Sequence, residues 1–107
     1  MAGPRRSIIW SREAEADLED IWTYYAESAG REVANDIVRA IGDICQMLEE
    51  HPLAGRERTE IRPGLRSALS SPHVIFYRVS GDVPEIVRIL DGRRDIDEIF
   101  SADSQQD

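Results

Sequence analysis

Residues 65–100, LRSALSSPHVIFYRVSGDVPEIVRILDGRRDIDEIF, carry the pattern that decides the fold. The strongest strand of the chain is predicted over 73–79, where β-branched and aromatic residues follow one another. Residues 80–84 have the composition of a hairpin turn, and 85–90 supply its partner strand. A shorter strand is predicted over 65–69. These neighbouring strands predict a small, largely antiparallel sheet.

The end of this stretch changes from extended to helical spacing. Asp91-Gly92 breaks the last strand, and Asp95 with Glu98 three residues later resembles a capping box. The short helix that follows is expected to bury Ile96, Ile99 and Phe100. The polar residues 101–107 are expected to be disordered, and so are residues 1–6.

Upstream of the sheet, the sequence predicts a brief strand over 7–10 and then two helices that meet at Gly30. Ser11 is placed to cap the first helix, which puts its apolar residues on one face: Ala14, Leu18, Ile21, Trp22 and Tyr25. The second helix has a stripe that steps by three and four residues: Ala34, Ile37, Ile41, Ile44 and Leu48. His51-Pro52 ends this helix, and 51–64 is predicted to be a loop.

The predicted fold class is α+β, with the order β-α-α-β-β-β-α. An antiparallel helical hairpin packs on one face of the small sheet, and a short C-terminal helix follows. Residues 1–107 are expected to form a single domain, because no repeat or linker divides them. The residues expected between hairpin and sheet are Trp22, Ile37, Ile41, Ile44 and Phe76.

Composition narrows the possible functions. The 107 residues carry a net charge of -8, and an acidic chain is a poor candidate for phosphate-driven nucleic-acid binding. No apolar run approaches the roughly 18 residues that span a bilayer, and the start does not resemble a secretory signal. With Cys45 as the only cysteine, a cytoplasmic location is expected. The charge is uneven: residues 11–51 have 3 Arg against 11 acidic residues, whereas 52–94 have 8 Arg against 5.

Candidate catalytic and metal-binding residues are sparse. His51 and His73 are the only histidines, and no Ser/His/Asp or Cys/His arrangement surrounds either of them. Cys45 lies on the apolar side of its helix, which is typical of a small buried hydrophobe. The first helix also carries a cluster of acidic residues: Glu13, Glu15, Asp17, Glu19 and Asp20. A solvated helix face is a better explanation for this cluster than a metal site. No catalytic residue, metal or cofactor is therefore predicted.

The arginines are the strongest candidates for a binding surface. Those that lie in or beside the three predicted strands are Arg62, Arg66, Arg78, Arg88, Arg93 and Arg94. They form either an anion-binding surface, for RNA phosphate or an acidic protein, or a scattered set offset by acidic neighbours. Spacing alone leaves both interpretations open.

Two segments, IIWSREAEADLEDIWTYYAE at 8–27 and the 65–100 stretch, resemble the ParE branch of the RelE/ParE toxins of bacterial type II toxin–antitoxin modules. The stretch from His51-Pro52 to Gly55 falls where such a loop lies in the family. The resemblance covers residues 8–100 and implies the fold that the residue pattern predicts.

The resemblance implies one of two activities. RelE-type members are messenger-RNA endoribonucleases that act in the ribosome, whereas ParE-type members poison DNA gyrase. RelE-type toxins use lysines and arginines with a tyrosine near the C-terminal end, but here the matching position is Phe100 and the chain has no lysine. Arg93 and Arg94 match the basic pair, yet arginine stays charged and is a poor proton shuttle. In ParE-type members a histidine often precedes the turn that contains the basic pair, and in this chain that position is Asp91.

We therefore predict a toxin without catalytic activity that inhibits DNA gyrase and is neutralised by a ParD-like antitoxin. The alternatives are a ribosome-dependent messenger-RNA endoribonuclease and a degenerate member that acts only through its antitoxin. Contact with nucleic acid is expected only through the antitoxin, and no membrane contact is expected. The residues predicted to contact target or antitoxin are Arg62, Arg66, Arg78, Arg93 and Arg94. The antitoxin tail is expected to carry both signs of charge, with a helix along the hairpin and an extended or acidic stretch near Arg62, Arg66, Arg78 and Arg93.

Overall fold

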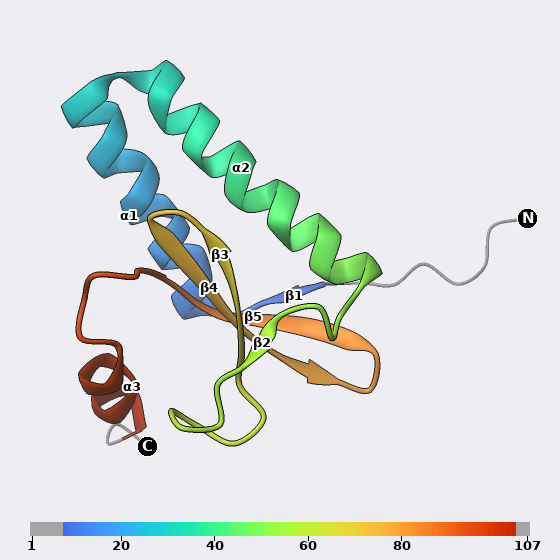
Figure 1. Ribbon diagram of the computed structural model, residues 1–107. Coiled ribbons are helices and arrows are strands. Elements are labelled where there is room, and N and C mark those ends of the chain that lie inside the picture. The colour runs from blue at the N-terminus through green and yellow to red at the C-terminus, as the bar shows by residue number, and fades with distance from the viewer. Residues whose placement is uncertain (1–7, 105–107) are drawn as a thin grey trace, which may run out of the picture.

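The computed structural model describes residues 8–104 (Figure 1). Its elements are β1 (Ile9–Trp10), α1 (Arg12–Ala29), α2 (Arg31–Glu50), β2 (Arg56–Glu57), β3 (Arg66–Ser70), β4 (His73–Ser80), β5 (Val83–Asp91) and α3 (Ile96–Ser104). This order confirms the predicted α+β fold with a helical hairpin and a C-terminal helix. The expected disorder of residues 1–6 and 105–107 lies outside the described residues.

The strands form one sheet in the order β1-β5-β4-β3-β2. β1 pairs with β5 in parallel, and the other neighbours are antiparallel. Two predictions are corrected. β2 lies inside the predicted loop 51–64, where its two residues are too few to show a strand pattern. α3 continues to Ser104, so residues 101–104 are helical although their polar composition predicted disorder.

Ser11 joins β1 to α1 and fixes both to the sheet. Its hydroxyl accepts a hydrogen bond from the backbone N–H of Ala14 at 3.0 Å, which confirms the predicted N-cap. The same hydroxyl donates to the carbonyl of Val87 at 2.8 Å, and the backbone N–H of Ser11 donates to the carbonyl of Ile86 at 3.0 Å. The first turn of α1 is therefore anchored on the edge of β5.

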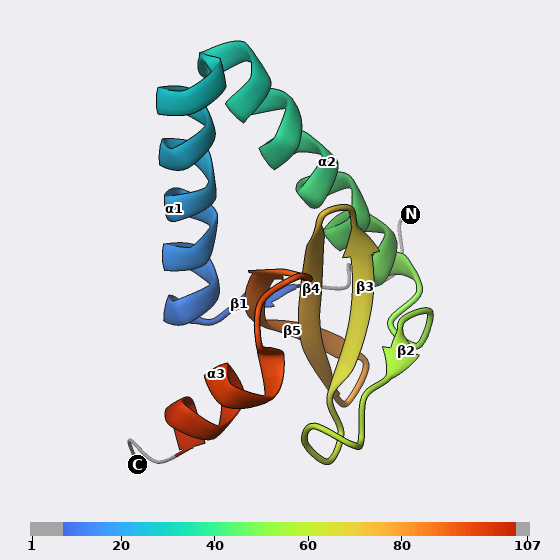
Figure 2. The same cartoon turned by 60° about the vertical axis from the view of Figure 1, so that its left-hand side comes forward.

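The helical hairpin packs on one face of the sheet, and its turn extends beyond the strands (Figures 1 and 2). Fully or nearly buried residues form the core on this face: Ala14, Ile41, Cys45, Leu48, Ile75, Tyr77, Ile86 and Ile89. Ile37 and Ile44 pack against this core and are partly buried. Trp22 is only half-buried, because its Nε1–H donates to Asn35 Oδ1 at 2.9 Å within the hairpin.

A second, smaller core lies on the opposite face of the sheet, under α3. Phe76 and Phe100 meet there edge to face at 5.1 Å, together with Leu65 and Leu90. The prediction that Phe76 lies between hairpin and sheet is therefore wrong. Its neighbour Tyr77 takes that place, because successive strand residues point to opposite faces of the sheet.

Candidate functional site

Helix α1 covers the edge of β5 that the short strand β1 leaves open. Asp17 reaches this edge, where its carboxylate accepts the backbone N–H of Ile89 at 2.9 Å. The same carboxylate accepts two hydrogen bonds from Arg88, from Nε at 2.8 Å and from Nη2 at 3.0 Å. The side chains of Asp17 and Arg88 are only 13% and 15% exposed. Asp17 is thus no part of a solvated acidic face, which corrects the prediction for this residue.

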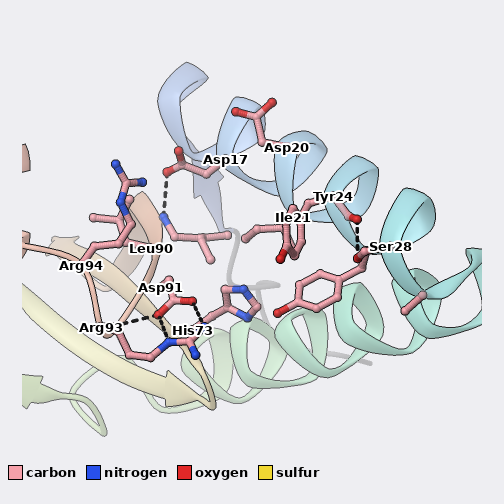
Figure 3. A pocket seen from close by; sticks show the side chains of 13 residues that line it. Asp17, Asp20, Ile21, Tyr24, Ser28, His73, Leu90, Asp91, Arg93 and Arg94 are labelled. Carbon is pink, nitrogen blue, oxygen red and sulfur yellow. Dashed lines mark hydrogen bonds and ion pairs between the residues drawn. The ribbon is translucent and has the colours of Figure 1, made fainter.

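Beyond Asp17, α1 and the end of β5 enclose a cleft of about 450 Å³, the α1–β5 cleft (Figure 3). Its helix wall and its strand wall are formed in the main by Asp20, Ile21, Tyr24, Tyr25, Ser28, His73, Asp91, Arg93 and Arg94. The lining combines charged side chains with the aromatic rings of Tyr24, Tyr25 and His73. Such a mixture suits a peptide better than a purely apolar ligand.

The turn after β5 is held by the ion pair of Asp91 and Arg93. Two guanidinium N–H groups of Arg93 donate to the carboxylate at 2.6 and 2.9 Å, and the backbone N–H of Arg93 also donates to it at 2.9 Å. These hydrogen bonds hold the pKa of Asp91 well below its usual range and raise the pKa of Arg93. Both groups stay charged at all physiological pH values, so the turn is not a proton donor or acceptor.

His73 lies in the wall of the cleft and is buried, with 4% exposure. Its ring stacks edge to face against Tyr25 at 6.0 Å. Burial lowers the pKa of His73, the Asp91 carboxylate partly opposes this shift, and Arg93 adds to it. The imidazole is therefore neutral in the folded protein at pH 7.

The free energy of unfolding is expected to fall as the pH decreases from about 7.5 to 5.5. The unfolded imidazole takes up a proton near pH 6.5 whereas the folded one resists it, so the unfolded state binds more protons in this range. The slope from one such group is at most about 1.4 kcal/mol per pH unit. Urea denaturation measures it.

Two variants separate His73 from other titrating groups in this experiment. His73→Phe keeps an aromatic ring against Tyr25 and should flatten the dependence on pH. His51→Asn changes the other, exposed histidine and should leave the wild-type slope. An unchanged slope in His73→Phe would rule out the assignment.

The arginines singled out from the sequence lie in three separate places. Arg62 and Arg78 line a second pocket of about 210 Å³ on the α3 side of the sheet, together with Glu13 and Glu85. Arg66 holds the loop before β2, where it donates to the carbonyl of Gly55 at 2.8 Å. Arg93 and Arg94 lie in the α1–β5 cleft. The structure therefore does not bring the five arginines together on one surface.

Most of these arginines are engaged by the chain's own groups. The guanidinium of Arg62 lies 4.9 Å from the centre of the Phe100 ring, and Nη2 donates to the Phe100 carbonyl at 3.3 Å. Arg78 pairs with Glu85 at 2.6 Å. Arg66 also approaches Glu57 at 3.4 Å. The contacts of Arg78 with Glu85 and of Arg66 with Glu57 join residues that stand opposite each other on neighbouring strands, whereas the contact of Arg62 with Phe100 joins segments far apart in the sequence.

Other candidate sites from the sequence remain without a chemical role. Burial raises the pKa of the Cys45 thiol to about 12, so this residue is a packed hydrophobe and not a nucleophile. Within residues 8–104, no cluster of three or more His, Cys, Asp or Glu side chains is arranged to hold a metal ion. The helices in that range are too short or too polar to cross a membrane.

Similar proteins establish the class and then the family. A solved chain described as "Chromosomal ParDE TA system from P. aeruginosa" has a TM-score of 0.71 and 31% sequence identity, covering 81% of this chain and 96% of that one. The hairpin-on-sheet architecture is thus that of a toxin–antitoxin protein. The family model "ParE toxin of type II toxin-antitoxin system, parDE" matches residues 8–96. The chain belongs to the ParE toxin family.

Three relatives that are themselves named as ParE toxins confirm this assignment. "Toxin ParE1" of Caulobacter vibrioides is 45% identical over 80 residues, which are 75% of this chain and 82% of the relative. "Toxin ParE3" of the same organism is 34% identical over 89 residues, or 83% of this chain and 89% of the relative. "Toxin ParE1" of Mycobacterium tuberculosis is 35% identical over 90 residues, or 83% and 92%. The predicted resemblance to ParE-type toxins is confirmed.

Proposed function

We propose that this chain acts as a single toxin domain that inhibits DNA gyrase by binding it, and that a ParD-like antitoxin neutralises it in the cytoplasm. The target follows from the family resemblance, and the partner from membership in a two-component system. The chain performs no covalent chemistry in this proposal. The toxin inhibits its target stoichiometrically, by occupying part of the target's surface.

The separation of the arginines carries the proposal. Cleavage of RNA through its 2′-hydroxyl needs a proton acceptor, a proton donor and cations that converge on one phosphate. Here Arg62 and Arg78 lie on the α3 side of the sheet, and Arg93 lies in the α1–β5 cleft with its guanidinium on Asp91. This arrangement favours protein contacts over a ribonuclease centre.

Phe100 adds a second argument against RNA cleavage. Its ring is 3% exposed, packed against Phe76 on one side and under the guanidinium of Arg62 on the other. A side chain in this position completes the small core beneath α3. The position that carries a tyrosine in RelE-type toxins therefore has a packing role in this chain.

Two assays on the purified protein test the target. We expect the toxin to inhibit supercoiling of relaxed plasmid by DNA gyrase, and to leave a defined message intact on translating ribosomes. Prior incubation with the cognate antitoxin should restore supercoiling. In cells, induction without antitoxin should arrest growth with filamentation while bulk messenger RNA stays intact.

The alternatives give different results in the same assays. Rapid cleavage of the ribosome-bound message would show a RelE-type ribonuclease and would overturn the proposal. Tight antitoxin binding without either activity would show a degenerate member that acts only through its antitoxin.

A further inference from the structure

The two walls of the α1–β5 cleft carry side chains of opposite charge that are not paired within the described residues. Asp20 lies on the helix wall and Arg94 on the strand wall (Figure 3). In the part of the chain that the structure describes, neither side chain has a hydrogen-bond or ion-pair partner. The other charged groups of the cleft are neutralised in pairs, Asp17 with Arg88 and Asp91 with Arg93. One negative and one positive group therefore remain for a ligand.

Next to Asp20, the helix wall presents an aromatic surface. Tyr24 is 64% exposed, so its ring is accessible to a ligand. Its ring meets Tyr25 edge to face at 5.1 Å, and Tyr25 in turn stacks on the buried His73. Tyr24 also lies one helical turn after Asp20, so the ring and the carboxylate are neighbours on α1. An aromatic face beside a carboxylate is a favourable place for a cation.

We propose that the α1–β5 cleft is a docking site for a short antitoxin segment that carries both signs of charge. A lysine or arginine of this segment stacks on Tyr24 and pairs with Asp20, and an aspartate or glutamate pairs with Arg94. The inference rests on the proposed neutralisation by an antitoxin and specifies where and by which chemistry one part of it binds.

Charge complementarity selects this occupant over single-sign ligands. A phosphate backbone or an acidic peptide would find Arg94 but would place negative charge against Asp20. A purely basic segment would meet Asp20 and be repelled by Arg94. The cleft volume of about 450 Å³ accommodates a few side chains of a peptide and no folded domain. A segment that folds on its partner can supply such side chains at low steric cost.

Titration calorimetry of the full-length toxin with its full-length cognate antitoxin tests the site. We expect Asp20→Arg, Arg94→Glu and Tyr24→Ala each to raise the dissociation constant by at least about tenfold, as loss of a central contact does. Tyr24→Phe should stay within about threefold of wild type, because a phenyl ring also binds a cation.

Two matched variants control for the change in net charge. Glu19→Arg alters the same helix next to Asp20 but outside the cleft, and Arg56→Glu alters β2 at the far edge of the sheet. Both positions are exposed. We expect both to bind with nearly unchanged affinity. Circular dichroism of every variant verifies that the fold is intact.

The possible results separate this inference from the proposed function. Wild-type affinity in all three cleft variants would overturn the docking site and leave antitoxin binding by the toxin intact. Failure of the wild-type toxin to bind the antitoxin would overturn the neutralisation itself. Variants that keep their antitoxin affinity but no longer inhibit gyrase would assign the cleft to the target, and this result also overturns the inference.

Discussion

Replacing Asp17 with alanine is expected to lower the free energy of unfolding by about 3–5 kcal/mol, the usual cost of breaking a buried ion pair from one side. The substitution removes three hydrogen bonds at once, two from Arg88 and one from the backbone N–H of Ile89. The guanidinium keeps its charge and loses this carboxylate while its side chain is 15% exposed. The backbone N–H of Ile89, on the edge of β5, also loses the carboxylate acceptor that α1 supplies.

Urea denaturation at neutral pH measures this loss, and Asp20→Ala is the matched control. Asp20 lies one turn further along α1, is exposed and has no partner among residues 8–102, so its change should stay within about 0.5 kcal/mol. The double variant Asp17→Leu/Arg88→Met removes both charges and should recover most of the stability. A loss below about 1 kcal/mol in Asp17→Ala would show that the ion pair does not hold α1 on the sheet.

The elements that the sequence predicted are those with a long repeating pattern. In α2 the apolar residues recur at three and four positions, and Ile41 and Leu48 of this stripe are fully buried. The run of β-branched and aromatic residues in β4, followed by a turn and the apolar residues of β5, predicts their antiparallel pairing, which the structure has. These patterns are local, so they can be recognised without knowledge of the rest of the chain.

The helix wall of the α1–β5 cleft could not be predicted from such patterns. Asp17 and Asp20 are the same residue type on the same helix, and both fit the pattern of an exposed acidic face. Only Arg88, 71 positions away along the chain, distinguishes Asp17 from Asp20. The contact of Arg62 with Phe100 likewise joins segments 38 positions apart, which no periodicity connects. For Phe76 and Tyr77, alternation predicts opposite faces but not which face receives the hairpin.

The loop before β2 provides the last test, because a glycine in it contacts a buried tyrosine. The backbone N–H of Gly55 donates to Tyr77 Oη at 2.8 Å, and this hydroxyl donates to the Pro52 carbonyl at 2.8 Å. A Cβ at position 55 would collide with the hydroxyl and would lie 2.8 Å from the Ser67 carbonyl oxygen. The Tyr77 side chain is fully buried and cannot move aside.

Gly55→Ala is therefore expected to destabilise the fold by about 2–4 kcal/mol, from overpacking and from buried polar groups that lose their partners. Gly42→Ala makes the same chemical change in α2, where no atom lies within 4 Å of the new Cβ. That variant should be more stable than wild type by about 0.5–1 kcal/mol, because alanine favours helix. Urea denaturation of both variants compares them directly. Equal effects of the two substitutions would mean that the loop adjusts to the methyl group and that Tyr77 does not determine its path.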